Sequence, residues 1–310
     1  MNWASACRTA VVAVGAWSWA SCGLAQAPAN RPPQNRLPQN RLPQNQLPAA
    51  SSPAGPQRLA RQTPPRFDRQ PQVARPPAYP PPIAEAIRTV EASLKALEQV
   101  ADYSCMMVKR ERIGGSLSAS EHLAVKLRHE PFSVYVKYLA PDHVRGQEAI
   151  YVHGHNDNRL LAHPNGLKGR FVRTVKLDPL GKLAMEGNRY PVTEMGIKRM
   201  AESWLEEARR DVQFVPCDAK TMPGAKLDGK PCTCVELTRR QRHHDLPYQL
   251  TRLYIDAELR LPVRYEAFEW PQTPGGEPEL AEEYTYRDLQ PNRRFDDLDF
   301  DVQNPEYGFR

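Results

Sequence analysis

Two histidines that flank Gly154, in the segment 153–157, are the first residues whose spacing could do chemistry. If a strand continues through the glycine, both imidazoles lie on one face and could hold a metal ion with a third ligand from elsewhere. His163 or the run 243–245, which is His-His-Asp, could supply that ligand. A polar turn with exposed imidazoles accounts for the same residues, and we favour it. We therefore predict no metal site and no cofactor.

The motifs of the common catalytic classes do not occur in the sequence. It has no Gly-x-Ser-x-Gly elbow, no His-Glu-x-x-His helix, no phosphate-cradling glycine loop and no Cys-x-x-Cys redox pair. Cys105 lies beside Met106 and Met107 in an apolar stretch. This environment is typical of a buried small hydrophobic side chain rather than of a nucleophile. We therefore expect the protein not to be an enzyme.

The N-terminus has the features of an export signal. Arg8 precedes an apolar run over residues 9–20, and small residues at 23–27 suit a signal peptidase. The run is too short for a comfortable membrane span. Cys22 lies in a sequence similar to a lipoprotein cleavage site, but Trp19 stands where leucine is usual, so we do not favour a lipid anchor. We predict a signal peptide over 1–27 and a location in the periplasm or cell envelope.

Removal of the signal leaves four cysteines, at positions 105, 217, 232 and 234. An oxidising compartment favours disulfides in an exported chain with an even cysteine count. Turn residues at 222–224 and 228–229 indicate a hairpin, which would place Cys217 opposite Cys232 or Cys234. We expect a disulfide between Cys217 and Cys232. A disulfide between Cys217 and Cys234 is the alternative. Zinc is less favoured because this Cys-x-Cys has no second pair at finger spacing.

Residues 28–82 form a separate segment that contains 16 of the 31 prolines and a five-residue near-repeat. Such a composition cannot bury a core and favours extended conformations, with a reach of roughly 170 Å at about 3.1 Å per residue. We predict a disordered linker. Its arginines could contact anionic lipid or cell-wall polymer, or the segment could be an inert spacer.

The net charge of +6 is unevenly distributed along the chain. Residues 1–82 contain nine arginines and one aspartate, which leaves 33 basic and 35 acidic side chains in residues 83–310. A near-neutral domain lacks the basic surface that nucleic-acid binding needs. Two short basic clusters remain, at 109–112 and 239–244, and each could contact an anionic surface or lie at an exposed strand end.

Hydrophobic periodicity predicts one α+β domain over residues 83–310. Apolar residues from Ile83 to Val100 recur at helical spacing, and a second helix is expected over 192–210. Period-two alternation predicts an antiparallel meander over 103–163. Later strands are expected at 212–217, 232–239, 248–256, 262–270 and 281–288. A sheet of this size must curl, with helices covering one face.

Several of these segments resemble a known family of exported bacterial proteins. They are Tyr103-Ser104-Cys105, residues 109–112, residues 126–135 around Pro131, and the blocks 177–179 and 187–191. Together they are similar to the domain-of-unknown-function family DUF1571. More distantly, the layout resembles the LolA/LolB superfamily of periplasmic lipoprotein carriers and receptors, whose paired late strands are similar to 254–256 and 261–264.

The resemblance covers roughly residues 83–302 and implies a curved antiparallel half-barrel covered by amphipathic helices, with an apolar cavity between them. In the carriers that cavity shields acyl chains, so a lipid or a lipidated protein is the expected partner. Ordinary core packing accounts equally for each side chain that we would place in such a cavity: Val134, Val136, Tyr138, Leu250, Tyr254, Phe268 and Trp270.

We therefore expect an envelope protein that binds an apolar ligand, a lipid or a lipoprotein acyl chain without catalysis. Desolvation would drive this binding, at roughly 0.8 kcal/mol for each buried methylene. The alternative is a structural or interaction protein of the envelope, whose sheet is fully packed and whose Pro-rich arm makes the contacts. A continuous cavity between sheet and helices would separate the two hypotheses.

Overall fold

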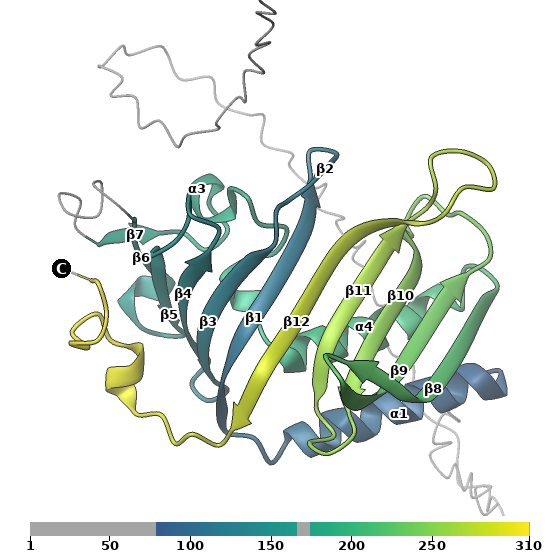
Figure 1. The fold of residues 1–310 in the computed structure, drawn as a ribbon, viewed down its shortest axis with the longest axis horizontal. Coiled ribbons are helices and arrows are strands. Elements are labelled where there is room, and N and C mark those ends of the chain that lie inside the picture. The colour runs from purple at the N-terminus through teal and green to yellow at the C-terminus, as the bar shows by residue number, and fades with distance from the viewer. Residues whose placement is uncertain (1–78, 166–173, 310) are drawn as a thin grey trace, which may run out of the picture. The chain divides into compact units, whose positions relative to one another are not determined.

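The computed structural model describes residues 79–165 and 174–309 (Figure 1). The predicted signal peptide and the predicted linker up to residue 78 lie outside the described residues. The first element is helix α1 (Pro81–Leu97), which begins with prolines in its first turn, where their missing N–H groups leave no bond unmade. Its buried stripe includes Ile83, Ile87 and Val90. No helix in the described part of the chain has the length and apolar character to cross a membrane.

The fold is dominated by one antiparallel sheet of 12 strands. They are β1 (Asp102–Ile113), β2 (Ser116–Leu117), β3 (Glu121–Arg128), β4 (Ser133–Ala140), β5 (Glu148–Val152), β6 (Leu160–His163), β7 (Val175–Leu177), β8 (Cys217–Leu227), β9 (Lys230–Arg239), β10 (Tyr248–Asp256), β11 (Pro262–Glu269) and β12 (Glu279–Pro291). The spatial order is β7-β6-β5-β4-β3-β1-β12-β11-β10-β9-β8, with β2 paired only to β1. Because β7 and β8 are the two edges, the sheet stays open.

Two meanders meet in the middle of this sheet, where β1 pairs with β12. The first meander contains the strands predicted over 103–163, and the edge strand β7 extends it beyond that stretch. The second contains the strands predicted after residue 230, and β10 matches its predicted bounds residue for residue. The prediction of a curved antiparallel α+β half-barrel is confirmed.

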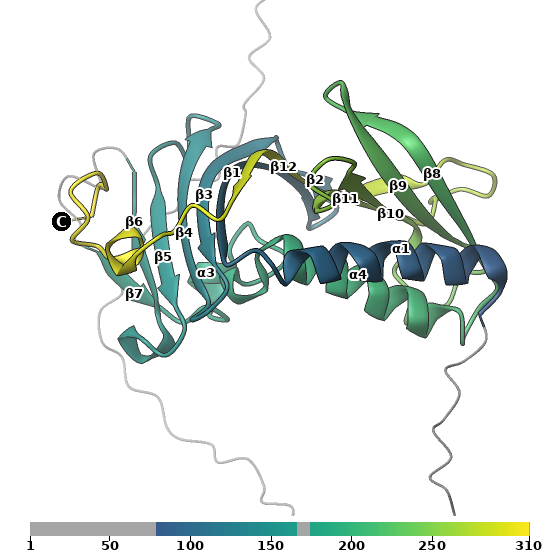
Figure 2. The same ribbon diagram turned by 90° about the horizontal axis from the view of Figure 1, so that it is seen from below.

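Helices cover the inner face of the sheet, which arches over α1 and α4 (Ile197–Asp211) in Figure 2. Trp204 of α4 and Val90 of α1 are fully buried, and they belong to one core with Leu237 and Leu253 of the sheet. The short helix α3 (Lys182–Met185) precedes α4 and packs over the first meander through Ala184. The helices therefore separate the inner face from solvent, as the sequence predicts.

The second helix begins later than its pattern suggests, at Ile197 rather than Val192. Residues Val192–Glu194 form a 3₁₀ turn, and Gly196 follows with φ of 120°. A Cβ on Gly196 would lie 2.9 Å from Leu127 Cδ1 and 3.1 Å from the Tyr103 hydroxyl, so only glycine fits this close approach. The Tyr103 hydroxyl accepts a hydrogen bond from the Ile197 amide at 3.1 Å. This contact fixes where the helix starts.

The predicted disulfide between Cys217 and Cys232 is wrong, because the hairpin turns later than expected. Asp228 and Gly229 form its turn with positive φ, which suits a two-residue hairpin loop. The Pro223–Gly224 region is only a bulge within β8. Cys217 therefore pairs with Arg239 and Cys232 with Ala225, at opposite ends of the hairpin. All four cysteines of the described residues are free thiols. The strand predicted at 212–217 begins only at Cys217, as β8.

The C-terminal segment after β12 covers the outer face of the first meander (Figure 1). It contains the 3₁₀ turn Asp297–Phe300, whose N-terminus is closed by a capping box. In it the Asp296 side chain accepts from the Asp299 amide, and the Asp299 side chain accepts from the Asp296 amide. Phe300 and Phe309 are buried there against Tyr135 and Ile150 of the sheet. Both faces of β4 and β5 are therefore buried, one under the helices and one under this segment.

Candidate functional site

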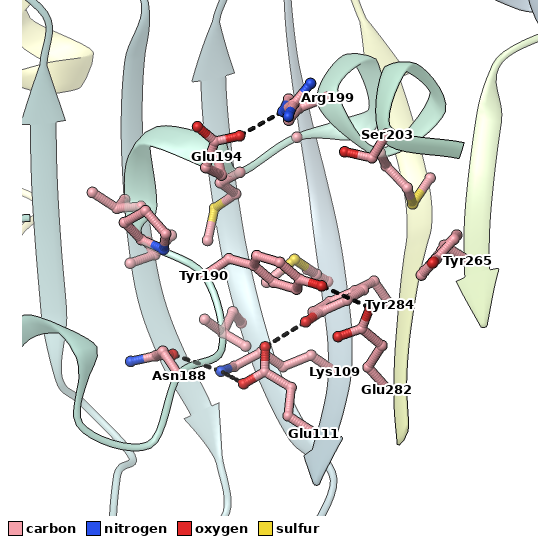
Figure 3. Close-up of a pocket in the computed structure, with 18 of the residues that line it drawn as sticks. Lys109, Glu111, Asn188, Tyr190, Glu194, Arg199, Ser203, Tyr265, Glu282 and Tyr284 are labelled. Atoms are coloured by element: carbon pink, nitrogen blue, oxygen red, sulfur yellow. Dashed lines mark hydrogen bonds and ion pairs between the residues drawn. The ribbon is translucent and has the colours of Figure 1, made fainter. Parts of the chain in front are cut away.

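A cavity of about 430 Å³ lies between the inner face of the sheet and the segment from α3 to α4 (Figure 3). Sheet residues from β6, β5, β4, β3, β1, β12 and β11 line it in that spatial order. Neighbouring strands are about 4.8 Å apart, so the six spacings correspond to roughly 29 Å across the sheet. The lining of the cavity therefore crosses seven neighbouring strands of the curved sheet.

The half of the cavity over β3–β6 is apolar, and we call it the apolar end. Its wall consists of Leu123, Val136, Ala149 and Leu160, each from a different strand of the first meander. Met195 and Met200 line the cavity from the α4 side. Methionine side chains are flexible and polarisable, which suits a wall that must adapt to different apolar surfaces.

The other half carries three glutamates, and we call it the acidic end: Glu111 of β1, Glu282 of β12 and Glu207 of α4. Glu111 is directly opposite Glu282 in the β1–β12 register. Side chains directly opposite each other in an antiparallel pair lie on the same face with Cβ atoms about 5 Å apart. The site therefore holds two neighbouring carboxylates, of which Glu282 is 1% and Glu111 3% exposed.

Lys109 lies two residues before Glu111 on β1, on the same face of the sheet, and forms an ion pair with it. Its ammonium lies 3.1 Å from Glu111 and 3.2 Å from Glu121, and it donates a 2.7 Å hydrogen bond to Asn188. Burial alone would lower the pKa of Lys109, but Tyr138 and the two carboxylates raise it. The lysine is therefore charged and has its donors occupied.

Glu282 is held by two tyrosines and one arginine. Its Oε1 accepts hydrogen bonds from the hydroxyls of Tyr190 at 3.0 Å and Tyr248 at 3.1 Å. Its Oε2 lies 2.8 Å from Nε of Arg189. Burial raises the pKa of Glu282 to about 7, and the nearby Glu207 adds to this effect, while Arg189 opposes it. The carboxyl therefore titrates near neutral pH.

Glu207 belongs to a buried ion network behind the acidic end. It lies 3.2 Å from Nη2 of Arg239, and the same nitrogen is 2.6 Å from Asp211. The hydroxyl of Tyr265 donates to Glu207 at 3.4 Å. Burial raises the pKa of Glu207, whereas the charge of Arg239 lowers it. The network fixes the C-terminal half of α4 to β9 and β11.

The segment Asn188-Arg189-Tyr190 ties the cavity cover to the sheet. Arg189 donates hydrogen bonds to the Arg112 carbonyl at 2.9 Å and to the Tyr248 hydroxyl at 3.0 Å, besides its ion pair with Glu282. In the sequence, residues 187–191 stand out only through the family resemblance. Their role in holding the cavity cover could not be predicted, because the partners of Arg189 come from β1, β10 and β12.

Of the residues that we predicted for the cavity, Val136 and Tyr138 line it. Val134 lies in the same buried cluster of the inner face but does not reach the cavity wall. Leu250, Tyr254, Phe268 and Trp270 do not line it either. Leu250, Tyr254 and Phe268 belong to the other face of the sheet.

Those three side chains lie on the outer face of the second meander. There the Tyr254 hydroxyl donates to Glu266 at 3.3 Å, and the guanidinium of Arg252 lies 5.5 Å from the Phe268 ring centroid. Leu250 is paired with Phe268 and so shares its face. Trp270 follows β11, where its Nε1 donates to the Leu246 carbonyl at 3.3 Å. The inner face takes the alternate residues of these strands, such as Leu253 and Tyr265.

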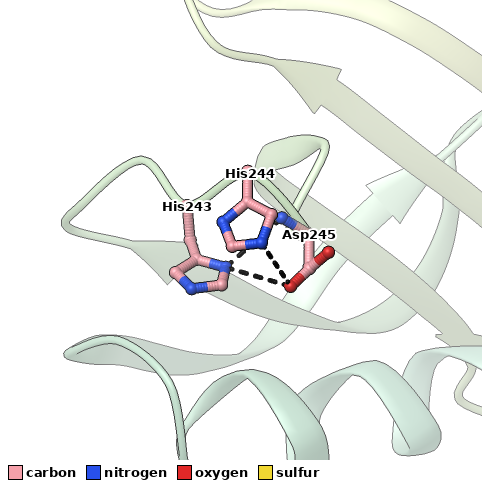
Figure 4. A group of neighbouring side chains, drawn as sticks. All are labelled: His243, His244 and Asp245. Carbon is pink, nitrogen blue, oxygen red and sulfur yellow. Dashed lines mark hydrogen bonds and ion pairs between the residues drawn. The ribbon is translucent and has the colours of Figure 1, made fainter.

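The residues considered for catalysis and metal binding do not meet in the cavity. Cys105 is buried, and burial raises its pKa, which makes the thiol a poor nucleophile. The two histidines flanking Gly154 are exposed and do not form a metal-ligating group. Among the described residues, the three-residue group with suitable spacing is the run at 243–245 (Figure 4), in which His243 is half-buried and the Asp245 amide donates to His243 Nδ1.

The arginines of the basic cluster at 239–244 are engaged in contacts within the protein. Arg239 is buried in the ion network, and Arg240 pairs with Asp218 at 2.5 Å. Arg242 donates to the Pro271 carbonyl at 3.1 Å and lies over the Trp270 ring. This run therefore offers no continuous basic surface to an anionic partner.

Comparisons with known proteins agree with the resemblance found in the sequence. A family model described as "Protein of unknown function (DUF1571)" matches residues 100–309. No curated protein gives a significant match. Solved structures with a similar chain path include the Mycobacterium tuberculosis lipoprotein LppX, with 12% identity, a TM-score of 0.39, and coverage of 66% of this chain and 95% of that one.

Two further solved structures are similar at the same level. A LolA superfamily protein from Nitrosomonas europaea has 13% identity and a TM-score of 0.29, covering 70% of this chain and 97% of its own. A DUF1329 family protein from Desulfovibrio piger has 11% identity and a TM-score of 0.35, covering 71% and 97%. At these values the likeness concerns chain path alone, and the sites must be interpreted from this chain's own residues.

Proposed function

The chain belongs to the DUF1571 family, whose function is unknown, and we propose that it binds an apolar ligand, a lipid or an acyl chain, without catalysis. The observation that carries the proposal is the cavity of about 430 Å³ with a wall of Leu123, Val136, Ala149 and Leu160. Its volume is in the range of about 300–1,000 Å³ typical of small-molecule sites.

Desolvation supplies the binding energy in this proposal. Each methylene that leaves water for the apolar end gains roughly 0.8 kcal/mol. The cover of the cavity already forms a fixed wall, because Asn188 and Arg189 hold it to β1 and β12 through buried polar contacts. A largely preformed site avoids much of the ordering cost that weakens flexible ones.

The proposal also assigns the chain a location and a role to each of its segments. Residues 1–27 direct the chain to the periplasm or cell envelope and are removed, residues 28–82 form a tether, and residues 83–310 form the binding domain. The partners would be a lipid or a lipidated protein, with the arginines of the tether close to an anionic membrane or cell wall. The rival proposal, a packed structural platform, has no use for an apolar cavity beneath its sheet.

Titration of the purified protein with the neutral fluorophore N-phenylnaphthylamine tests the proposal, because this dye brightens when it leaves water. We expect saturable binding, reversed by a single-chain aliphatic alcohol such as dodecanol. Fluorescence that rises without saturation, or that dodecanol does not reverse, would refute a ligand cavity and favour the structural role.

A further inference from the structure

The two ends of the cavity differ in chemistry, and this difference bears on the class of ligand. Apolar side chains of the first meander form one end, and Glu111, Glu207 and Glu282 stand at the other. A ligand that fills the cavity therefore meets hydrocarbon along β3–β6 and carboxylates beside β1, β12 and β11. Such a site suits an amphiphile with its apolar chain in the apolar end and its polar head at the acidic end.

The charged residues that line the cavity are predominantly acidic, and Arg189 and Arg239, which pair with Glu282 and Glu207, lie outside the lining. Five glutamates line the cavity, at positions 111, 194, 206, 207 and 282, against three basic residues, Lys109, Arg199 and Arg210. The bases are already engaged: Lys109 by Glu111, Arg199 by Glu194 at 2.5 Å, and Arg210 by Asp211 at 2.7 Å. None of the described basic side chains of the lining is therefore free to receive an anionic head.

Glu282 offers a second, independent sign of what the acidic end would accept. It is 1% exposed, and no described residue donates a hydrogen bond to its Oε2, although Nε of Arg189 lies 2.8 Å away without hydrogen-bond geometry. Its carboxyl group points between Tyr190 and Tyr284 in the cavity wall (Figure 3). An ionised carboxylate only accepts hydrogen bonds, so its natural complement is a donor.

The raised pKa of Glu282 indicates that its surroundings disfavour negative charge. Burial raises its pKa to about 7 even though Arg189 is beside it. The surroundings thus disfavour the carboxylate form, and a second anion placed there would meet both the same desolvation and the charge of Glu282 itself. Low-dielectric walls strengthen such a field rather than screening it.

We infer that the ligand is a single-chain amphiphile whose head group donates hydrogen bonds and carries no negative charge. This inference rests on the proposed function, since it needs a ligand in the cavity. It distinguishes amines and glycerol-type heads from free fatty acids and anionic phospholipids. The apolar end sets affinity for the chain, and the acidic end selects the head.

Competition between amphiphiles of equal chain length tests the inference on the whole purified protein. Dodecylamine, dodecanoyl glycerol and dodecanoate are each titrated against bound N-phenylnaphthylamine at about pH 8, where a carboxyl of pKa about 7 is ionised. We expect the amine and the glyceride to displace the dye at concentrations about tenfold lower than dodecanoate. Dodecanoate that competes equally or better overturns the inference while leaving the proposed function intact.

Two variants that each remove one negative charge test whether the acidic end selects the head group. Glu282→Gln and Glu207→Gln should each bring the ratio between dodecylamine and dodecanoate to within about threefold. The control is Glu283→Gln, whose carboxylate pairs with Arg264 on the outer face of the same strand at 2.6 Å, and it should keep the wild-type ratio. A ratio unchanged in both cavity variants overturns the inference. Failure of the dye to bind the wild type removes the proposed function as well.

Discussion

Glu111 on β1 lies directly opposite Glu282 on β12, and both side chains line the same cavity although neither is more than 3% exposed. Like charges directly opposite in a sheet are destabilising, and burial adds to the cost. Lys109 and Arg189 offset this cost by pairing with one carboxylate each. Two tyrosine hydroxyls also donate to Glu282. Such an arrangement is characteristic of a site rather than of a core.

Glu282 should make the stability of the protein depend on pH. Its pKa is raised from 4.5 to about 7, so between these values the folded state holds a proton that the unfolded chain releases. The resulting stability is fully present below pH 4.5 and is lost as the pH rises through about 7. At about 1.4 kcal/mol for each pH unit, this group accounts for a loss of up to about 3 kcal/mol.

Urea unfolding of the wild type and Glu282→Gln across this pH window measures the effect. The difference in unfolding free energy between the two should change by up to about 3 kcal/mol in favour of the variant as the pH rises. Glu283→Gln on the outer face serves as the control and should follow the wild type. Parallel curves for wild type and Glu282→Gln would show that the carboxyl does not titrate there.

A larger side chain at the apolar end should block binding. Ala149 lines the cavity from β5, and Ala149→Phe places a ring where the aliphatic chain would lie. We expect affinity for N-phenylnaphthylamine to fall at least about tenfold, or about 1.4 kcal/mol. The same change at exposed Ala257, in the turn after β10, should leave binding unchanged. Equal affinities of the two variants would place the dye elsewhere.

Adjacent arginines at the end of β9 should differ sharply in importance. Arg239 is 1% exposed and pairs with the equally buried Asp211, so Arg239→Leu leaves a buried carboxylate with less compensation. We expect a loss of about 3 kcal/mol or more in unfolding free energy. Arg240→Leu removes only an exposed pair with Asp218 and should unfold like the wild type. Chemical denaturation measures the unfolding free energy of both variants. Similar losses in the two would contradict the burial of this network.

The C-terminal segment should be an integral part of the fold. Phe300 is 4% exposed and packs with Tyr135 and Ile150 on the outer face, so Phe300→Ala should cost about 3 kcal/mol. Leu298, in the same 3₁₀ turn, is 48% exposed, and Leu298→Ala should change stability by less than about 0.5 kcal/mol. Thermal unfolding compares the two, and a Phe300→Ala variant as stable as Leu298→Ala would mean that the segment does not dock.

Local sequence patterns were sufficient for most elements of the fold. The stripe that begins at Ile83 predicted α1, and alternation predicted β10 at its observed bounds. These signals depend on short-range periodicity, which burial of one face imposes directly on the sequence. The start of α4 was missed because it depends on Gly196 fitting against Leu127 and Tyr103, which lie far away in the sequence.

The cavity residues were harder to predict because both faces of the second meander carry apolar side chains. In β10, Leu253 and Ile255 point inward while Leu250 and Tyr254 point outward, so alternation does not reveal which set is buried. Lys109 and Glu111 resemble a solvated strand end in the sequence. Only the pairing of β1 with β12 shows that they face inward, and that pairing joins distant parts of the chain.

A crystal structure of the protein with dodecanol brominated at its terminal carbon tests the central claim most directly, because anomalous scattering locates the bromine. We predict a bromine peak at the apolar end, among Leu123, Val136 and Leu160, with the hydroxyl toward the acidic end. A bromine peak confined to the outer face, with side chains filling the space between sheet and helices, would contradict it.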